Sequence, residues 1–279
     1  MYKPSKEAIS ISENDHKRSD KVCDFIKTYK GNSIAKGTIP KIIIQYWDNP
    51  KQIPKDVNKC VKTWDKLDSK DYKHLLFNDY SARKLIANKF NQRHVKAYDH
   101  CYHPAMKSDY FRLCFIHSYG GCYIDTDDAY CGTNIEHLFN DARLKLQPLC
   151  YDVSTNSMVD PNKFTKPKQY STNWIFYFNN NPIIAPPKNP IIQYALKRAT
   201  DILLKPNHDN LPDIQSTTGP GNLTASVVAQ MTTSNSYEVE THFRVLTNWA
   251  NYIDTIWSLR YRNDNRNWRL SNKKNFYRE

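Results

Sequence analysis

The sequence is short of glycine. Its 279 residues include seven glycines, where average usage of about 7% would give about twenty. Neither GxGxxG nor GxxxxGK[ST] occurs in the chain, and both patterns rely on glycine to bring the backbone close to a phosphate. We therefore expect neither a dinucleotide-binding βα turn nor a P-loop. The glycines that remain include two close pairs, Gly120 with Gly121 and Gly219 with Gly221.

Long apolar runs are also missing. Runs such as Ile42–Ile44 and Ile183–Ala185 are far shorter than the roughly 20 residues that a membrane-spanning helix needs. Residues 1–7 do not show the basic and then apolar pattern of a secretory signal peptide. We therefore expect a cytoplasmic protein that does not cross a membrane.

The seven cysteines show no CxxC pair and fall mostly inside apolar stretches. Their number is odd, and a cytoplasmic protein keeps its thiols reduced. This pattern favours buried free thiols over disulfides.

The net charge of +12 indicates an anionic partner, and nucleic acid, an acidic membrane surface and a nucleotide diphosphate all qualify. Residues 257–279 mix arginines with Tyr and Trp, which suits single-stranded nucleic acid. No RNP-like, helix-turn-helix or zinc-finger pattern accompanies them. We therefore expect no nucleic-acid partner. The same segment suits a peripheral contact with an anionic membrane at its inner face.

Apolar periodicity along the chain alternates between strands and helices, which predicts an α/β fold with a mostly parallel sheet. We expect residues 1–38 to form an N-terminal leader or helical segment, 39–256 the catalytic domain, and 257–279 a basic aromatic segment that completes the site or faces a membrane. The expected strands are 39–47, 72–77, 122–124, 174–178 and 182–185, and the expected helices are 22–29, 54–67, 79–90, 105–119, 191–204 and 223–231.

The most informative stretch is a helix, a double glycine, a short strand and an acidic cluster. Asp125 and Asp127 follow a buried strand, and the carboxyl end of a strand is where open α/β sheets bind ligands. Two such carboxylates can hold one divalent cation and leave coordination positions for phosphate oxygens. The alternative interpretation of this motif is a solvated acidic turn without a metal. Asp109 and Arg112 lie on the same face of the preceding helix. They form either a surface ion pair or a pair that faces the acidic cluster.

These residues carry a family resemblance. Residues 105–113, ending in Asp-Tyr-Phe-Arg-Leu, and 119–127, reading Tyr-Gly-Gly-Cys-Tyr-Ile-Asp-Thr-Asp, resemble the glycosyltransferases with a DXD-containing sugar-binding region. That family includes capsule and lipopolysaccharide enzymes and initiating mannosyltransferases, and the clostridial glucosylating toxins share a related core. Further similarity covers residues 39–47, 180–185 and 218–220.

The resemblance implies a GT-A fold, a Rossmann-like α/β domain with helices on both faces of the sheet. It also implies a retaining transferase that forms an α-linkage and uses Mn²⁺ or Mg²⁺. The expected donor is a nucleotide-sugar, with UDP-sugar favoured. The expected acceptor is a glycan or a lipid-linked oligosaccharide in surface polysaccharide synthesis.

By position, the resemblance also assigns roles to residues. Asp109, Arg112, Asp125 and Asp127 form the implied catalytic set, with Asp127 as the direct metal ligand and Asp125 beside the ribose and the sugar. Trp47 matches the aromatic residue that stacks on the base. The implied donor-binding residues are Trp47, Asp109, Arg112, Tyr123, Asp125, Asn180, Gly219 and Trp268.

The sequence departs from the family pattern near its C-terminus. Relatives often complete the metal site there with a His or a Glu followed by Trp, whereas this chain has Asn267-Trp268. Asn267 is thus the candidate third metal ligand, with His242 as another possibility. Gly219 suits a close approach of backbone to the sugar, or a plain turn before a helix. Asn180 suits contacts with hydroxyls, or a plain turn.

A second enzyme class also places Asp-x-Asp after an apolar strand, namely the haloacid-dehalogenase-like phosphatases. Those enzymes have Thr or Val two residues after the second Asp, where this chain has Ala129. They also carry the motif after the first strand, whereas here it follows the third expected strand. The pattern therefore favours the transferase.

Overall fold

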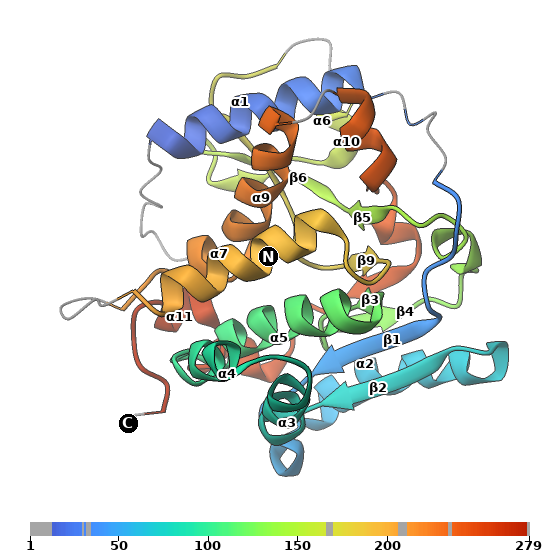
Figure 1. The fold of residues 1–279 in the computed structure, drawn as a ribbon, viewed down its shortest axis with the longest axis vertical. Helices are drawn as coiled ribbons and strands as arrows, with labels where there is room; N and C mark the ends of the chain where they lie inside the picture. Colours follow the sequence, from blue (N-terminus) through green and yellow to red (C-terminus); the bar gives the residue numbers. More distant parts are fainter. Residues whose placement is uncertain are drawn as a thin grey trace.

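The computed structural model describes residues 13–29, 31, 35–165, 170–205, 211–233 and 236–277. Its centre is a six-stranded sheet with the order β10-β5-β9-β3-β1-β2 (Figure 1). β9 runs antiparallel to both of its neighbours, and the other strands run parallel to one another. The expected mostly parallel sheet is confirmed. Its strands are β1 (Ile42–Tyr46), β2 (Lys73–Phe77), β3 (Gly121–Tyr123), β5 (Leu144–Leu146), β9 (Ile183–Ala185) and β10 (Phe243–Val245).

Both faces of the sheet are covered by apolar cores. Successive residues of a strand point to opposite faces, so neighbouring residues belong to different cores. Ile44 and Tyr123 belong to the main apolar core, together with Phe111 of the long helix α5. Ile43 and Cys122 belong to a second core on the other face. Figure 1 shows α3 (Asp79–Lys89), α4 (Gln92–Asp99), α5 (Pro104–Tyr119) and α7 (Pro190–Leu203) on one side of the sheet, with α2 (Lys55–Thr63) behind it.

Helix α5 and strand β3 meet at the double glycine. Pro104 occupies the first turn of α5, where its missing N–H costs no hydrogen bond. The helix ends at Gly120, whose φ of 68° is left-handed, and Gly121 follows with a φ of 111°. A Cβ on Gly121 would lie 2.6 Å from the carbonyl oxygen of Ile42. Only glycine lets β3 pair with β1 at this point.

Smaller elements complete the molecule. Helix α1 (Glu13–Thr28) begins earlier than the expected helix 22–29, and it packs with α9 (Pro220–Thr233) against β8 (Trp174–Phe178). A three-stranded sheet contains β7 (Ser157–Met158), β6 (Pro148–Asp152) and β8, and a two-stranded sheet pairs β4 (Asp128–Tyr130) with β11 (Ile253–Thr255). The remaining elements are η1 (Pro50–Gln52), η2 (Trp64–Lys70), η3 (Glu136–Leu138), α6 (Pro161–Phe164), α8 (Ile214–Thr217), α10 (Ser236–His242), η4 (Trp249–Asn251), η5 (Arg260–Asn263) and α11 (Trp268–Ser271).

Several expectations are corrected in detail. The expected helix 54–67 is divided, because the α-helical bonds of α2 end at Thr63 and the chain continues as the 3-10 helix η2. The expected strand 39–47 pairs only over Ile42–Tyr46. Residues 1–12 of the expected leader lie outside the described residues. All seven cysteines are free, and six of them are buried. Among the described residues, no helix combines the length and apolarity that a membrane span requires.

Candidate active site

The acidic cluster lies where two parallel strands end side by side. β1 and β3 pair through Ile44 and Tyr123, so the residues that follow each strand emerge at the same edge of the sheet. The N–H of Ile124 donates to the carbonyl oxygen of Ile44 at 3.0 Å. The amide of Gln45 donates to the carbonyl oxygen of Asp125 at 3.1 Å. These bonds fix the start of the loop that carries Asp125, Asp127 and Asp128, here called the acidic loop, against β1.

Arg112 stands at the centre of the site rather than on the surface. It is 4% exposed, and its Nη2 lies 3.0 Å from Asp109 Oδ1 and 3.1 Å from Asp125 Oδ1. Nη2 also donates to the Tyr123 hydroxyl at 2.9 Å, and Nη1 donates to the carbonyl oxygen of Asn180 at 2.7 Å. A buried guanidinium is tolerated because it is paired in this way. Arg112 thus joins α5, the acidic loop and the segment after β8.

Asp109 is held from two sides. The Asn180 amide donates to its Oδ1 at 2.8 Å, and the Thr218 hydroxyl donates to its Oδ2 at 3.2 Å. Burial raises the pKa of Asp109 to about 6, although Arg112 opposes this shift. A Cβ on Gly219 would lie 3.3 Å from Oδ2 of Asp109. Asn180 and the Thr218-Gly219 turn therefore support Asp109 directly.

The three acids of the loop have different surroundings. The side chain of Asp125 is 37% exposed, whereas that of Asp127 is 11% exposed. Oδ2 of Asp127 accepts from the Tyr261 hydroxyl at 2.7 Å and pairs with Arg262. Burial, followed by the charge of Asp125, raises the pKa of Asp127. Asp125 is the most open of the three to an incoming ligand.

Asp128 is a residue of this loop to which the sequence assigned no role. Its carboxylate accepts from the Thr255 hydroxyl at 2.6 Å and from the Asn181 amide at 2.8 Å. Burial and the charge of Asp127 raise its pKa to about 7. Asn181 also accepts from the N–H of Asp125 at 3.1 Å. Asp128 therefore anchors the loop, and its position next to Asp127 was the only signal for it in the sequence.

The described part of the C-terminal segment, residues 257–277, also contributes side chains to the site. Tyr261 meets the ring of Trp47 edge-on, with 5.5 Å between ring centroids, and its hydroxyl contacts Asp127. The guanidinium of Arg266 lies 5.8 Å from the Trp47 ring centre. Trp47 itself is buried at 6% exposure. Tyr261, Arg262 and Arg266 are site residues that the sequence did not single out individually, although it marked their segment.

Two expected C-terminal residues make contacts other than the expected ones. The Asn267 amide donates to the carbonyl oxygen of Arg262 at 2.6 Å, and its side-chain oxygen caps the N–H of Arg269 at 3.1 Å. Asn267 therefore shapes the turn that carries Arg262, and its side chain is already committed to the backbone. Trp268 is half-buried, packs against the main core and lies under the guanidinium of Arg269.

His242 lies away from the acidic loop. It directly precedes β10, which runs parallel to β3 through β5. The start of a parallel strand is at the opposite edge of the sheet from the acids. In the described part of the chain, no group of three His, Cys, Asp or Glu side chains has the geometry of a metal site.

The chemistry of the remaining donors still fits a divalent cation. Asp125 and Asp127 offer hard oxygens from one loop, as Mg²⁺ and Mn²⁺ prefer. Even without Asp128, whose pKa is raised to about 7, three carboxylates, of Asp109, Asp125 and Asp127, face two guanidinium groups, of Arg112 and Arg262. This surplus of negative charge, together with the open Asp125, is what a divalent cation would neutralise.

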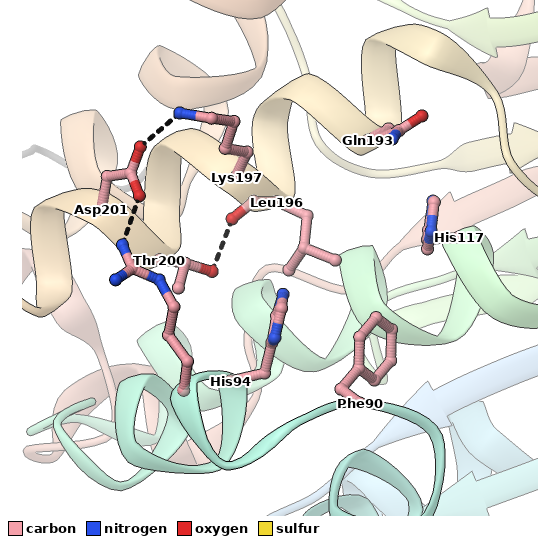
Figure 2. Close-up of a pocket in the computed structure, with 9 residues that line it drawn as sticks. Phe90, His94, His117, Gln193, Leu196, Lys197, Thr200 and Asp201 are labelled. Carbon is pink, nitrogen blue, oxygen red and sulfur yellow. Dashed lines mark hydrogen bonds and ion pairs between the residues drawn. The ribbon is translucent and has the colours of Figure 1, made fainter.

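A separate hollow of about 580 Å³ lies between α4, α5 and α7 (Figure 2). Phe90, His94 and His117 line one side of it, and an ion-paired group of Arg93, Lys197 and Asp201 lines the other. His117 is near the end of α5, beyond Arg112, so the hollow is at the far edge of the sheet from the acids. It shares no lining residue with the acidic loop.

One comparison with known proteins, a family model, matches the part of the chain that carries this site. Residues 54–144, which include α5 and the acidic loop, match the family model described as glycosyltransferase sugar-binding region containing DXD motif. A comparison with curated proteins finds no match. Among solved structures, the chain is similar to the "PaToxG Glycosyltransferase" at 14% identity and a TM-score of 0.43, over 82% of this chain and 86% of that chain. The family match supports the expected resemblance to the glycosyltransferases with a DXD-containing sugar-binding region, and it covers 91 of the 279 residues.

Proposed function

We propose that the protein is a glycosyltransferase that takes its sugar from a nucleotide-sugar donor bound at the acidic loop. The observation that carries the proposal is the cluster of the buried Asp109 and Arg112 with the open Asp125, next to Asp127 at the carboxyl edge of the sheet. Such an edge is where α/β folds bind nucleotides. A cluster that only stabilised the fold would not need an open carboxylate such as Asp125.

The residues then have distinct tasks. Arg112 fixes the carboxylates of Asp109 and Asp125 relative to each other, so that both are ready for the donor. Asp125, the more exposed acid, accepts hydrogen bonds from the ribose and sugar hydroxyls. Trp47 provides an aromatic surface for the base once Tyr261 and Arg266 make room.

Asp125 and Asp127 are the residues that would hold a divalent cation. When bound, the cation would stabilise the negative charge that grows on the departing nucleotide diphosphate. The protein's own contribution is to hold the two acids in place. Tyr261 and Asn181 do this through their bonds to Asp127 and to the backbone of Asp125.

The finer features of the reaction are proposals from the family resemblance. We propose a UDP-sugar donor, Mn²⁺ or Mg²⁺ as the metal, retention of configuration with formation of an α-linkage, and a glycan or lipid-linked acceptor. Surface polysaccharide synthesis at the cytosolic side of a membrane is the setting we propose, and the net charge of +12 supports a contact with an anionic surface.

A thermal-shift panel of UDP- and GDP-sugars, with and without Mn²⁺, tests the proposal. A ligand at 100 times its Kd stabilises the folded state by about 2.7 kcal/mol, so a true donor should raise the unfolding temperature. We expect this rise only when Mn²⁺ is present, because the metal holds the diphosphate of the donor. Asp127→Asn should abolish that shift. No shift with any nucleotide-sugar would contradict the proposal. A phosphatase would instead trap phosphate on Asp125, which mass spectrometry would detect and Asp125→Asn would prevent.

A further inference from the structure

Arg262 occupies an unusual position for an arginine of a basic C-terminal segment. Its Nη2 forms an ion pair with Oδ2 of Asp127, the acid expected to bind the metal most directly. Its guanidinium carbon lies 4.4 Å from the ring centre of Trp257. The indole is 60% exposed, whereas the Arg262 side chain is 13% exposed. Arg262 thus lies between Asp127 and an aromatic ring at the molecular surface.

The contacts of Arg262 are incomplete. Its Nε is buried and has no hydrogen-bond partner among the described residues. Nε1 of Trp47, whose ring touches Tyr261, is also buried without a partner in the described part of the chain. Buried N–H donors are nearly always paired in folded proteins. Two unpaired donors beside the acidic loop indicate a ligand that brings acceptor oxygens, and phosphate oxygens suit a guanidinium best.

A divalent cation on Asp127 would compete with Arg262 in its present position. Arg262 already contacts Oδ2 of Asp127, and a cation bound there would repel the guanidinium at short range. A nucleotide diphosphate would remove this conflict, because it carries enough negative charge to pair with both. The free enzyme, by contrast, needs Arg262 on Asp127 to offset the buried carboxylates.

We infer that Arg262 is an exchangeable cation of the donor site. It neutralises Asp127 in the free enzyme, gives up this acid to the divalent cation, and pairs through Nε and Nη with the diphosphate of the donor. Metal and diphosphate therefore bind together more tightly than either does alone. This inference rests on the proposed function, since it assumes that the acidic loop is the metal and donor site.

The first test measures Mn²⁺ binding without nucleotide, from the electron paramagnetic resonance signal of free Mn²⁺. Arg262→Gln removes the competing cation, so Mn²⁺ should bind at least about fivefold more tightly than to the wild type. Arg260→Gln is the matched control, because Arg260 is an exposed arginine of the same 3-10 turn and removes the same formal charge. Its Mn²⁺ affinity should change less than twofold. Equal affinities of Arg262→Gln and the wild type would overturn the inference.

The second test measures how Mn²⁺ and UDP or GDP affect each other's affinity, by calorimetry. In the wild type, saturating Mn²⁺ should tighten nucleotide binding by at least about tenfold, and Arg262→Gln should lose most of that gain. Arg262→Lys, which keeps the charge without the planar fork, should retain part of it. If the glutamine variant does not fold, Arg262→Met, which also removes the charge, replaces it in both tests.

Asp127→Asn separates this inference from the proposed function. If the Asn variant binds Mn²⁺ and nucleotide as the wild type does, the acidic loop is not the donor site and the proposed function fails. If the Asn variant loses both ligands while Arg262→Gln behaves as the wild type, the proposed function stands. The inference that Arg262 exchanges Asp127 for the diphosphate is then wrong.

Discussion

Arg112 is the residue that connects the separate parts of the site. It contacts Asp109 on its own helix, Asp125 on the acidic loop and the carbonyl oxygen of Asn180 after β8. Nη2 contacts both carboxylates and Nη1 contacts the carbonyl oxygen, and Tyr123 stacks beneath the fork with 3.8 Å from the guanidinium carbon to the ring centre. Geometry at this residue matters as much as charge.

Arg112→Lys tests that point. Lysine keeps the charge, but a single ammonium cannot replace the fork that reaches Asp125 and Asn180 together. We expect kcat/KM to fall by about 100-fold, and the free energy of unfolding to fall by about 1–3 kcal/mol because buried partners lose their hydrogen bonds. The control is Arg83→Lys, which alters an exposed pair with Asp99. Wild-type kcat/KM in Arg112→Lys would contradict this account of the cluster.

Donor binding should depend on pH through Asp109. Burial raises the pKa of its carboxyl to about 6, against the effect of Arg112. The charged form accepts from Asn180 and pairs with Arg112, so donor affinity is complete well above pH 6 and is lost as the pH falls through about 6, by at most about tenfold per unit for one proton. Asp128, with a pKa raised to about 7, acts in the same direction.

Calorimetric titrations of the donor between pH 5 and 8 measure this dependence. Asp109→Asn should bind the donor more weakly at pH 8 and should lose affinity less steeply between pH 7 and pH 5. An Asn variant with the same steep loss as the wild type would show that another group controls donor binding.

At the scale of elements, the turn between α5 and β3 sets the position of the acidic loop. Gly120 and Gly121 both have positive φ, and the loop begins four residues after Gly121. The chain therefore reverses direction within two residues and passes directly from the helix that carries Arg112 to the strand that ends at the acids. A side chain at either glycine would meet backbone atoms closer than 3.0 Å.

Gly121→Ala should therefore be severe. Its Cβ would lie 2.6 Å from the carbonyl oxygen of Ile42, in addition to the strain of a φ of 111°. We expect the free energy of unfolding, measured with urea, to fall by more than about 2 kcal/mol. Gly132→Ala is the control, since Gly132 has a φ of 90° but no atom within 4 Å of a Cβ, and about 1 kcal/mol is expected there. Equal losses in both variants would rule out the steric conflict.

The sequence predicts most clearly those elements whose ends are marked by residues that start or stop a helix or a strand. Pro104 and the double glycine bound α5 clearly, and the structure places its ends at Pro104 and Tyr119. β5 and β10 were not expected, because each has only three residues, too few for the apolar pattern to indicate a strand. The antiparallel direction of β9 was also not predictable, since an apolar run such as Ile183–Ala185 looks the same in either direction.

At the scale of the whole molecule, the site is assembled from segments far apart in the chain. Local spacing identified Asp109, Arg112, Asp125 and Asp127, which lie within a short stretch of α5 and the loop after β3. It did not identify Arg262, which reaches Asp127 across 135 positions, because no periodicity connects the two residues. The cap that holds the Asn267 side chain likewise depends on a turn that appears only in three dimensions.

The surplus of positive charge belongs to the molecule as a whole and predicts binding to anionic membranes. With a net charge of +12, the protein should sediment with vesicles that contain phosphatidylglycerol at low salt. It should be released by about 0.5 M salt, where the Debye length is only a few ångströms. Pure phosphatidylcholine vesicles are the control. Binding that persists at high salt, or none at low salt, would refute a peripheral electrostatic contact.

The central claim is that sugar transfer takes place at the acidic loop with Asp127 as an essential group. Its most direct test compares sugar transfer by the wild type and by Asp127→Ala, from the nucleotide-sugar that the thermal-shift panel selects, with circular dichroism to check the fold. We predict that the variant keeps the wild-type spectrum and loses transfer by at least about 1,000-fold. Full transfer by Asp127→Ala in the presence of a chelator would contradict the account.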